Sequence, residues 1–425
     1  MSTSSFDLTA ALRRVRQASD LINAPTQSSR LEILSDDVIA LRIKALAAMG
    51  EAISRHQDDI LEANTLDLEI SRDMAVPDLV VDWLKLTPER VQKVVSIFHK
   101  LALTGVDYAS GGSAGDSTVQ YRTCPVGTVG FMYEAFPDLG AIAAALCICT
   151  GNALILKGGS EASRSNRIIA TLLRQSLEAV GLPADLIFPI ESTEVSRQDV
   201  AQCSDIDLII AHGRPSLVEQ VVHQASVRVI PSRMGNCYLY WSASGSLDTV
   251  YQMTAESHCG SPDAVNRIEK ILIHASHSPN AIVRLWNRLQ EGGFDVVADE
   301  AISALHSTVA AQDAIKAADS DWHCAYLRKK IALRQVEDDK TAIEWINEHS
   351  SGHADSIATT DYTQSHRFIN GCRSATVYVN ASPKFIRDAR RPGAIAIGAS
   401  NYKGNNGGLI SMDVMQVRQR IFHSS

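Results

Sequence analysis

Eight cysteines are the residues of this 425-residue sequence that could carry out covalent chemistry. A cysteine becomes a nucleophile when its surroundings favour the thiolate. Cys259 follows His258, and a cysteine beside a histidine is a tempting pair. Adjacent side chains, however, point to opposite faces of an extended segment and diverge by about 100° on a helix. An unreactive thiol near a helix end is therefore the favoured interpretation of Cys259.

A lysine and two glycines follow the short apolar run 153–156, which is predicted to be a strand. Glycines allow a ligand to approach the backbone closely, so Lys157-Gly158-Gly159 suits contact with a nucleotide. A surface lysine in a turn at the end of the strand is the alternative interpretation. His349 and His353 have the spacing of two zinc ligands on a helix, but Gly352 interrupts that helix, and a zinc site is not favoured.

The composition excludes several classes of protein. The chain is 45% hydrophobic and 21% charged, which is typical of a globular protein. Its net charge of −8 gives no sequence-wide basic footprint for nucleic acid. The longest apolar stretch, 139–149, is shorter than the roughly 20 residues of a membrane-spanning helix. The first residues lack the pattern of a secretory signal, so we expect a cytoplasmic protein with reduced thiols and no membrane partner.

Helical and extended patterns alternate along most of the chain. Strands separated by helices of 10 to 17 residues predict βαβ units around a parallel sheet, hence an α/β fold. The predicted helices are 36–72, one that begins at 87–89, 139–149, 164–180, 250–258, 279–292 and 341–349. The predicted strands are 128–133, 153–156, 186–190, 206–210, 227–230, 267–273, 294–297, 356–359 and 376–380.

Three segments carry a resemblance to a known family: PVGTVGFMYEAFPD (125–138), CTGNALILKGGSE (149–161) and VYVNAS (377–382). The sequence resembles γ-glutamyl phosphate reductase, also called glutamate-5-semialdehyde dehydrogenase, a branch of the aldehyde dehydrogenase superfamily. The resemblance runs over nearly the whole chain. It implies an aldehyde dehydrogenase-like α/β fold with two Rossmann-like domains and a small oligomerisation arm, and hence a homodimer or higher oligomer.

The resemblance also implies domain boundaries. The nucleotide-binding-type domain is expected to comprise 1–105 and 126–245. The catalytic-type α/β domain is expected to comprise 246–383. The oligomerisation arm and tail are expected to comprise 106–125 and 384–425.

The family reduces γ-glutamyl phosphate with NADPH, and a cysteine thiolate attacks the acyl group. The family motif around that cysteine is matched here by Pro262, Asn266 and Glu269, so the alignment is well defined. Val265 stands where the family has its catalytic cysteine. Valine has no lone pair to attack with, so the sequence predicts that the thiol-dependent chemistry is lost. Cys259, six residues upstream, is the weak candidate for a substitute.

The family's substrate region is altered in two places. In the family's Tyr-Glu-Ala-Arg-Pro-Asn, the arginine is Phe136 here and the asparagine is Asp138. Both changes remove hydrogen-bond donors, and Asp138 adds a negative charge that we expect to repel an oxyanion or an acyl phosphate. The positions that the resemblance implies for substrate binding are Tyr133, Glu134, Asp138, Asn266 and Asn380.

The cofactor implied by the resemblance is NADP(H). Its binding residues are implied to be Lys157, Gly158, Gly159, Glu161 and Gly213. The glutamate that binds the ribose near the nicotinamide is replaced by Ala325, which offers no acceptor. The family's Pro-Arg-Gly-Gly is here Ala-His-Gly-Arg (211–214), and Gly213 is predicted to begin a helix whose N–H groups could meet a phosphate.

Three hypotheses follow from these residues. The first is a divergent γ-glutamyl phosphate reductase homologue that has lost its reductive chemistry and retains a nucleotide or a glutamate-like ligand. The second is a repurposed enzyme that presents an amino-acid acyl phosphate to an amine without cysteine or hydride transfer. The third is a non-catalytic scaffold or regulator with a kinase or reductase partner. None of the three involves nucleic acid.

Overall fold

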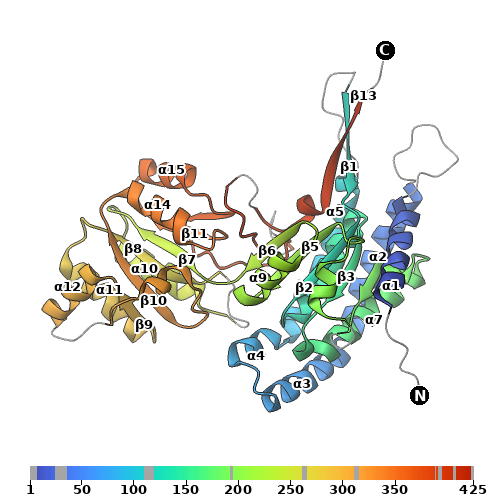
Figure 1. Cartoon of the computed structure of the whole chain (residues 1–425), viewed down its shortest axis with the longest axis horizontal. Helices are drawn as coiled ribbons and strands as arrows, with labels where there is room; N and C mark the ends of the chain where they lie inside the picture. The colour runs from blue at the N-terminus through green and yellow to red at the C-terminus, as the bar shows by residue number, and fades with distance from the viewer. Residues whose placement is uncertain are drawn as a thin grey trace. The chain divides into compact units, whose positions relative to one another are not determined.

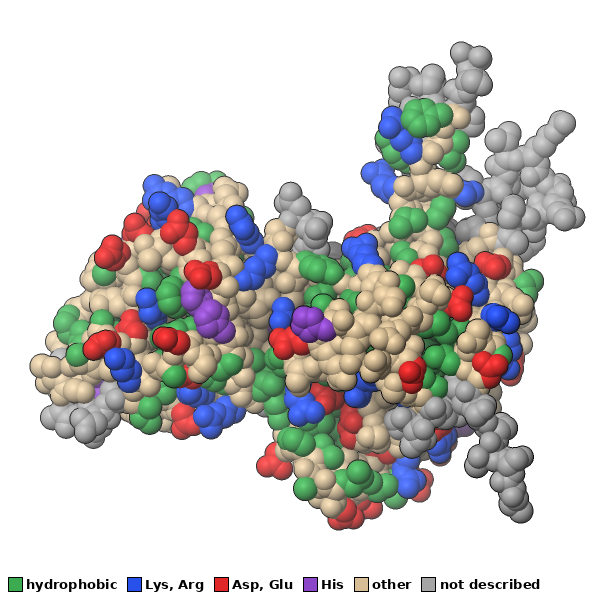
Figure 2. All heavy atoms as spheres, in the orientation of Figure 1, with side chains coloured by type: hydrophobic (Ala, Val, Ile, Leu, Met, Phe, Trp, Pro, Cys, Tyr) green, Lys and Arg blue, Asp and Glu red, His purple; other side chains and the backbone are tan. Residues whose placement is uncertain are grey.

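The computed structural model describes residues 7–23, 36–109, 119–191, 195–260, 266–310, 315–387, 389–390, 395–404 and 408–422. The chain divides into two compact units. Unit 1 comprises Met1–Ile230, Arg387–Ile397 and Ile410–Ser425, and unit 2 comprises Pro231–Ile386 and Gly398–Leu409. On the face shown in Figure 2, side chains of both charge signs are interspersed.

Unit 1 contains most of the helices. They are α1 (Leu8–Asn23), α2 (Asp36–Arg55), α3 (Gln57–Asp73), α4 (Asp78–Leu84), α5 (Pro88–Ala109), α6 (Pro137–Thr150), α7 (Ser163–Ala179), α8 (Arg197–Ala201) and α9 (Pro215–Gln224), with short 3₁₀ helices at Ser160–Ala162, Ala184–Leu186 and Met412–Met415. Its strands are β1 (Val119–Pro125), β2 (Thr128–Tyr133), β3 (Ala153–Lys157), β4 (Ile187–Pro189), β5 (Leu208–Gly213), β6 (Val229–Arg233) and β13 (Gln416–Phe422).

Five of these strands form one sheet, in the order β4-β3-β2-β5-β6 (Figure 1). The strand β2 pairs in parallel with β3 on one side and with β5 on the other, and β3 pairs in parallel with β4. Every residue of β2, β3 and β5 is buried, as expected of strands in a parallel sheet that is covered on both faces.

The helix α6 lies in the interior of unit 1. All its residues except Asp138 are buried, which fits a helix that is apolar on every side. Gly151 ends it with φ +81°, a left-handed conformation that glycine adopts without a steric penalty. None of the described helices is long and apolar enough to cross a membrane.

The strands β1 and β13 form a separate two-stranded sheet. They pair antiparallel from Val119 opposite Phe422 to Pro125 opposite Gln416. Figure 1 shows them as a narrow ribbon. These strands belong to the segments that the sequence assigns to an oligomerisation arm, and that role stays a prediction.

Unit 2 is built around a second sheet. Its helices are α10 (Leu247–Ser257), α11 (Pro279–Glu291), α12 (Glu300–Ala310), α13 (Asp319–His323), α14 (Asp339–His349) and α15 (Tyr362–Gly371). Its strands are β7 (Cys237–Trp241), β8 (Ile268–His274), β9 (Asp295–Ala298), β10 (Lys330–Val336), β11 (Asp355–Ala358) and β12 (Val377–Val379). The strand order is β12-β11-β7-β8-β10-β9, and all five neighbouring pairs are parallel.

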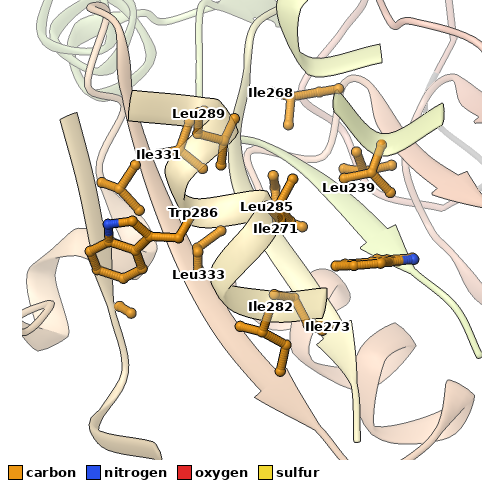
Figure 3. Packing of buried hydrophobic residues seen from close by; sticks show 14 of the residues in the cluster. Leu239, Ile268, Ile271, Ile273, Ile282, Leu285, Trp286, Leu289, Ile331 and Leu333 are labelled. Atoms are coloured by element: carbon orange, nitrogen blue, oxygen red, sulfur yellow. The ribbon is translucent and has the colours of Figure 1, made fainter. Parts of the chain in front are cut away.

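The sheet of unit 2 has a separate hydrophobic cluster on each face. Helix α11 places Ile282, Leu285 and Leu289 on one stripe, which packs against the sheet (Figure 3). In β8, Ile271 and Ile273 belong to this cluster. The intervening Leu272 faces the other way and joins the cluster under α14 and α15. The alternation of strand side chains thus fills both faces of the sheet.

One predicted helix is wrong. The sequence predicts a single helix over 36–72, whereas the structure has α2 and α3 with a break at His56. The backbone of His56 has φ −101° and ψ 25°, and its Nδ1 lies 2.7 Å from Oδ2 of Asp59 in the first turn of α3. The sequence gives no sign of this break, because the apolar periodicity continues through it without a glycine or proline.

Candidate functional site

The carboxyl ends of β2, β3 and β4 meet at one edge of the sheet in unit 1, because these strands run parallel. The chain passes from β2 to β3 and β4 on one side, and β5 follows on the other side of β2. Ligands of open α/β sheets bind outside the carboxyl ends of the strands, where the strand order reverses. This edge is therefore the candidate site in unit 1.

A pocket opens at this edge with about 400 Å³ of empty space, part of which is open solvent, and we call it the carboxyl-edge pocket. Its lining residues are Tyr133, Leu156, Gly158, Gly159, Ser163, Asn166, Arg167, Pro189, Ile190 and Glu191. Three residues named from the sequence, Tyr133, Gly158 and Gly159, are thus brought together. Lys157 and Glu161 belong to the same segment but do not line the pocket.

The two glycines leave room for the ends of neighbouring side chains, which would have to move if either residue gained a Cβ. A Cβ at Gly158 would lie 2.3 Å from the Asn166 side-chain nitrogen, and one at Gly159 would lie 2.1 Å from Glu161 Oε1. The Glu161 carboxylate accepts a hydrogen bond from the Ala135 N–H at 2.6 Å. Glu161 therefore fastens the glycine segment to the end of β2, and it supports the pocket from outside.

Lys157 is buried at the end of β3. Its Nζ donates to the backbone carbonyl of Glu191 at 2.9 Å. The alternative interpretation of Lys157 as a surface lysine is wrong. The ammonium group holds the residue that follows β4 against the pocket.

Arg167 and Glu191 form a two-pronged ion pair on the pocket wall. Nε and Nη2 of Arg167 lie 2.8 and 2.7 Å from the two carboxylate oxygens of Glu191. The hydrogen bonds from Arg167 lower the pKa of Glu191, and the same pair raises the pKa of Arg167. Both side chains are therefore charged at neutral pH.

Tyr133 closes the inner side of the pocket. Its hydroxyl donates to Asn166 Oδ1 at 3.0 Å, and its ring stacks on Phe131 with 4.6 Å between centroids. Burial raises the pKa of Tyr133 well above its usual value. Tyr133 is thus a neutral hydroxyl at physiological pH and does not serve as a base there.

The N-terminus of α9 lies next to this edge, where the sequence predicts a phosphate contact at Gly213. Gly213 has φ +153° and precedes the helix, but a carboxylate of the chain fills the position. Glu134 accepts from the backbone N–H of Arg214 at 3.3 Å and from its Nε at 3.0 and 2.9 Å. Pro215, the first residue of α9, has no N–H to offer.

Carboxylates also lie at the N-termini of α7 and α6, the two other long helices that follow these strands. At the start of α7, Asp67 accepts from the N–H groups of Arg164 at 3.1 Å and Ser165 at 2.8 Å. In the first turn of α6, Asp138 forms an ion pair with Arg90. Negative groups favour helix N-termini, so the charges that a bound phosphate would supply are already present.

The sequence suggests that the negative charge of Asp138 would repel an oxyanion or an acyl phosphate. In the structure, Arg90 compensates this charge. Arg90 donates to both carboxylate oxygens of Asp138, and burial lowers the pKa of the neighbouring Arg387 to about 10 while the charge of Asp138 opposes that shift. Beside this pair, Phe136 adopts a left-handed conformation with φ 36° and stacks on Trp83 at 5.4 Å. The residues that replace the family's donors are therefore part of the interior of unit 1.

In unit 2, the segment predicted to hold the nucleophile position, Val265, lies outside the described residues. Cys259, at the end of α10, is exposed. Its neighbour His258 is buried, with Nε2 2.8 Å from the carbonyl oxygen of Ile268, and burial lowers its pKa to about 4. The imidazole is therefore engaged by the backbone of β8, and it is not placed to activate Cys259.

The two asparagines named from the sequence both bond to the backbone. Asn266 is buried and donates to the carbonyl of Pro383 at 3.0 Å. Asn380 has φ 52°, accepts from the Thr359 N–H at 2.9 Å and donates to the Thr359 carbonyl at 2.7 Å. These contacts tie β12 and the residues after it to the rest of unit 2.

The segment around Ala325 is anchored by a buried carboxylate. Glu269 on β8 accepts from the N–H groups of Tyr326 and Leu327, each at 2.8 Å, and lies 3.3 Å from Lys270 Nζ. Burial lowers the pKa of Lys270, and the charge of Glu269 opposes that shift. The methyl group of Ala325 provides no acceptor on this well-ordered segment.

The described cysteines include all eight of the chain, and none is in a disulfide. Burial raises the pKa of five of them, Cys147, Cys149, Cys203, Cys237 and Cys372. Cys237 lies 3.3 Å from Nε2 of His353 and is fully buried, which agrees with a structural thiol. His349 instead stacks on Trp345 at 3.8 Å, so the two histidines face different partners.

Known proteins resemble this chain over most of its length. It is 42% identical over 390 residues to γ-glutamyl phosphate reductase 2 of Synechocystis sp. PCC 6803, covering 89% of this chain and 91% of that protein. It is 32% identical over 370 residues to the γ-glutamyl phosphate reductase of Gloeobacter violaceus, covering 85% and 87%. The chain belongs to the γ-glutamyl phosphate reductase family. No protein-family model matches it.

Solved structures agree with the predicted fold. The crystal structure of γ-glutamyl phosphate reductase from Thermotoga maritima superposes with a TM-score of 0.82, at 24% identity over 99% of both chains. A glyceraldehyde-3-phosphate dehydrogenase from Methanocaldococcus jannaschii, solved as a complex with NADP, gives a TM-score of 0.67 at 16% identity, covering 98% of this chain and 94% of that one. The aldehyde dehydrogenase-like α/β fold is thus confirmed.

The sequence did not identify several of the residues that line the carboxyl-edge pocket. Asn166 and Arg167 lie in the first turns of α7, and Glu191 follows β4. They meet because α7 packs beside β4, and no local motif joins an arginine to a glutamate 24 residues away. Glu191 could have been identified from its position directly after a predicted strand, which is the signal that pointed to Lys157.

Proposed function

We propose that this chain is a γ-glutamyl phosphate reductase homologue that has lost the thiol-dependent reduction and retains a nucleotide-binding unit. The observation that carries the proposal is Val265 at the position of the family's catalytic cysteine. The assignment of that position depends on Pro262, Asn266 and Glu269, which match the motif on both sides. A valine there cannot form the thioester through which the family transfers its acyl group.

The thiols of the chain support the loss. An attacking cysteine must be accessible and must favour its thiolate. Five thiols have raised pKa values because they are buried. Of the two exposed thiols, Cys259 and Cys324, Cys259 follows His258, whose Nε2 is held at the Ile268 carbonyl. The loss of an acceptor at Ala325 points in the same direction.

The retained nucleotide site is supported by the carboxyl-edge pocket. Its position beyond the ends of three parallel strands is the usual one for nucleotides, and Gly158 and Gly159 let a ligand approach the backbone. The fit to NADP(H) itself is incomplete. Glu191 places a carboxylate on the pocket wall, and Glu134 fills the start of α9. The residues present fit a ribose better than its 2′-phosphate, and no hydride step is assigned to this chain.

The test is covalent capture together with turnover. Purified protein is mixed with γ-glutamyl phosphate and NADPH, NADPH oxidation is followed, and the intact protein is weighed by mass spectrometry. We expect neither turnover nor an acyl adduct with the wild type. We expect Val265→Cys to gain an adduct, because a thiolate can displace phosphate from the acyl group, and Val265→Ala to gain none.

Turnover by the wild type would overturn the proposal. The variant Cys259→Ser then identifies the cause, because loss of that turnover would make Cys259 the nucleophile. An adduct on the wild type at any other cysteine would contradict the proposal equally. We propose further that the chain forms an oligomer through the β1–β13 ribbon and binds a glutamate-like ligand.

A further inference from the structure

The acidic side chain of Glu191 lies on the wall of the carboxyl-edge pocket. The family's cofactor, NADP(H), carries a 2′-phosphate on its ribose, and a carboxylate would repel that group. We propose that this pocket binds a ribose with free 2′- and 3′-hydroxyls, as in AMP and NAD(H), and rejects a 2′-phosphorylated ribose such as that of NADP(H). This inference rests on the proposed function, which retains a nucleotide in unit 1. It makes Glu191 the residue that sets the specificity.

The polar groups of the pocket suit a sugar diol. The carboxylate of Glu191 can accept hydrogen bonds from two neighbouring hydroxyls, which is how an acidic residue recognises an unphosphorylated ribose in dinucleotide-binding folds. Its two oxygens each bond to Arg167 once, and a carboxylate has about four acceptor sites. The Asn166 side-chain nitrogen faces Gly158 on the same wall and can donate.

Glu191 is held in place from two directions. Lys157 Nζ fixes its backbone carbonyl at 2.9 Å, and Arg167 fixes its carboxylate. Lys157 is almost completely buried, so its ammonium group is committed to this contact, and it is not presented to the pocket. Lys157 therefore acts as a positioning residue for Glu191.

The charge balance of the pocket disfavours a phosphate. Its lining residues include one cation, Arg167, and one anion, Glu191, and the two are already paired. A 2′-phosphate could take Arg167 only by breaking that pair, which would leave Glu191 beside a dianion. If the pair stays intact, the phosphate meets a lining with no net charge, and the one further cation that acts on Glu191, Lys157, is buried behind the lining and donates to the Glu191 carbonyl. Either arrangement costs binding free energy that a 2′-hydroxyl does not.

The neighbouring helices increase the share of the binding free energy that depends on the ribose. In many nucleotide-binding folds the pyrophosphate gains affinity from a helix N-terminus. Here Glu134 already accepts from the N–H of Arg214, directly before α9, and Asp67 accepts from two N–H groups in the first turn of α7. The phosphates of a nucleotide therefore gain less from the protein, and recognition depends more on the ribose.

The experiment compares two pairs of ligands that differ by the 2′-phosphate. Binding of 5′-AMP and 2′,5′-ADP, and of NADH and NADPH, is measured by calorimetry on the full chain. We expect the unphosphorylated member of each pair to bind about tenfold or more tightly, which corresponds to about 1.4 kcal/mol. Glu191→Gln should reduce that ratio by weakening the diol contact and removing the repulsion. Glu178→Gln, an exposed control on α7, should leave it unchanged.

The outcomes separate this inference from the proposed function. Equal or tighter binding of NADPH and 2′,5′-ADP by the wild type would overturn the specificity while leaving the nucleotide site intact. A ratio that does not change in Glu191→Gln would assign the specificity to another residue and contradict the inference. If none of the four ligands binds, the retained nucleotide site is wrong, and the inference fails with it. Circular dichroism of each variant verifies that it is folded.

Discussion

Asp138 offers the sharpest test of how unit 1 is stabilised. It occupies a position where the family has asparagine, so Asp138→Asn removes the charge and keeps the shape. The side chains of Asp138 and Arg90 are 13% and 7% exposed, and the charge of Asp138 also acts on the half-buried Arg387. The substitution leaves both guanidinium groups without that carboxylate. Removing one partner of a buried ion pair costs about 3–5 kcal/mol.

The structure places the expected loss at the lower end of that range. Arg90 also donates to the backbone carbonyls of Trp83, at 3.2 Å, and Lys85, so it keeps two acceptors in the variant. We therefore expect Asp138→Asn to lower the free energy of unfolding by about 3 kcal/mol. The measurement is urea unfolding followed by circular dichroism.

The matched control is Asp185→Asn. Asp185 pairs with Arg174 at 3.2 Å, but these side chains are 26% and 29% exposed, and such pairs contribute below about 1 kcal/mol. A second comparison repeats Asp138→Asn in an Arg387→Met background, where the loss should be smaller because one of the cations that interact with Asp138 is gone. A loss for Asp138→Asn no greater than that for Asp185→Asn would refute the reasoning.

Two further predictions concern charge. Burial lowers the pKa of His258 to about 4, so the unfolded chain takes up this proton first as the pH falls, and stability should drop by about 3 kcal/mol between pH 6.5 and 4. Urea unfolding across this pH range should show that slope flattened in His258→Gln and kept in the control His366→Gln, an exposed residue; an unchanged slope in His258→Gln would contradict it. Glu134→Gln should strengthen pyrophosphate binding about two- to fivefold by calorimetry, since the charge at the start of α9 is removed; an unchanged affinity would show that Glu134 does not compete with phosphate.

The sequence predicted those helices and strands whose hydrophobic pattern matches the sides that are buried. The uniformly apolar run of α6 and the stripe of α11 were both found, because periodicity reports directly on which sides are covered. The strand β10 was not predicted. It carries Arg334 and Gln335 in a sheet interior, and the guanidinium of Arg334 lies 3.6 Å from the ring centroid of Trp345 on α14. The sequence of β10 alone does not show that one of its charged side chains packs against an aromatic ring of another element.

The candidate site divides in the same way. Residues in one continuous motif, such as Gly158 and Gly159, were found from the sequence. The partners that give the pocket its charge come from separate elements, such as Arg167 with Glu191. Pairs of this kind depend on which strand lies beside which, and strand order is set by the packing of the whole unit. The interpretation of Lys157 as a surface residue failed for the same reason.

Two substitutions at the carboxyl edge of unit 1 act together with residues that were already there. Arg214 replaces a glycine of the family motif and pairs with Glu134, which the motif retains. Asp138 replaces an asparagine and pairs with Arg90. Each of these charged side chains thus has a partner inside the unit, but only the Asp138–Arg90 pair is largely buried, since the Arg214 side chain is 38% exposed. Both pairs place a carboxylate at the start of a helix, where a bound phosphate would otherwise gain from the helix N-terminus.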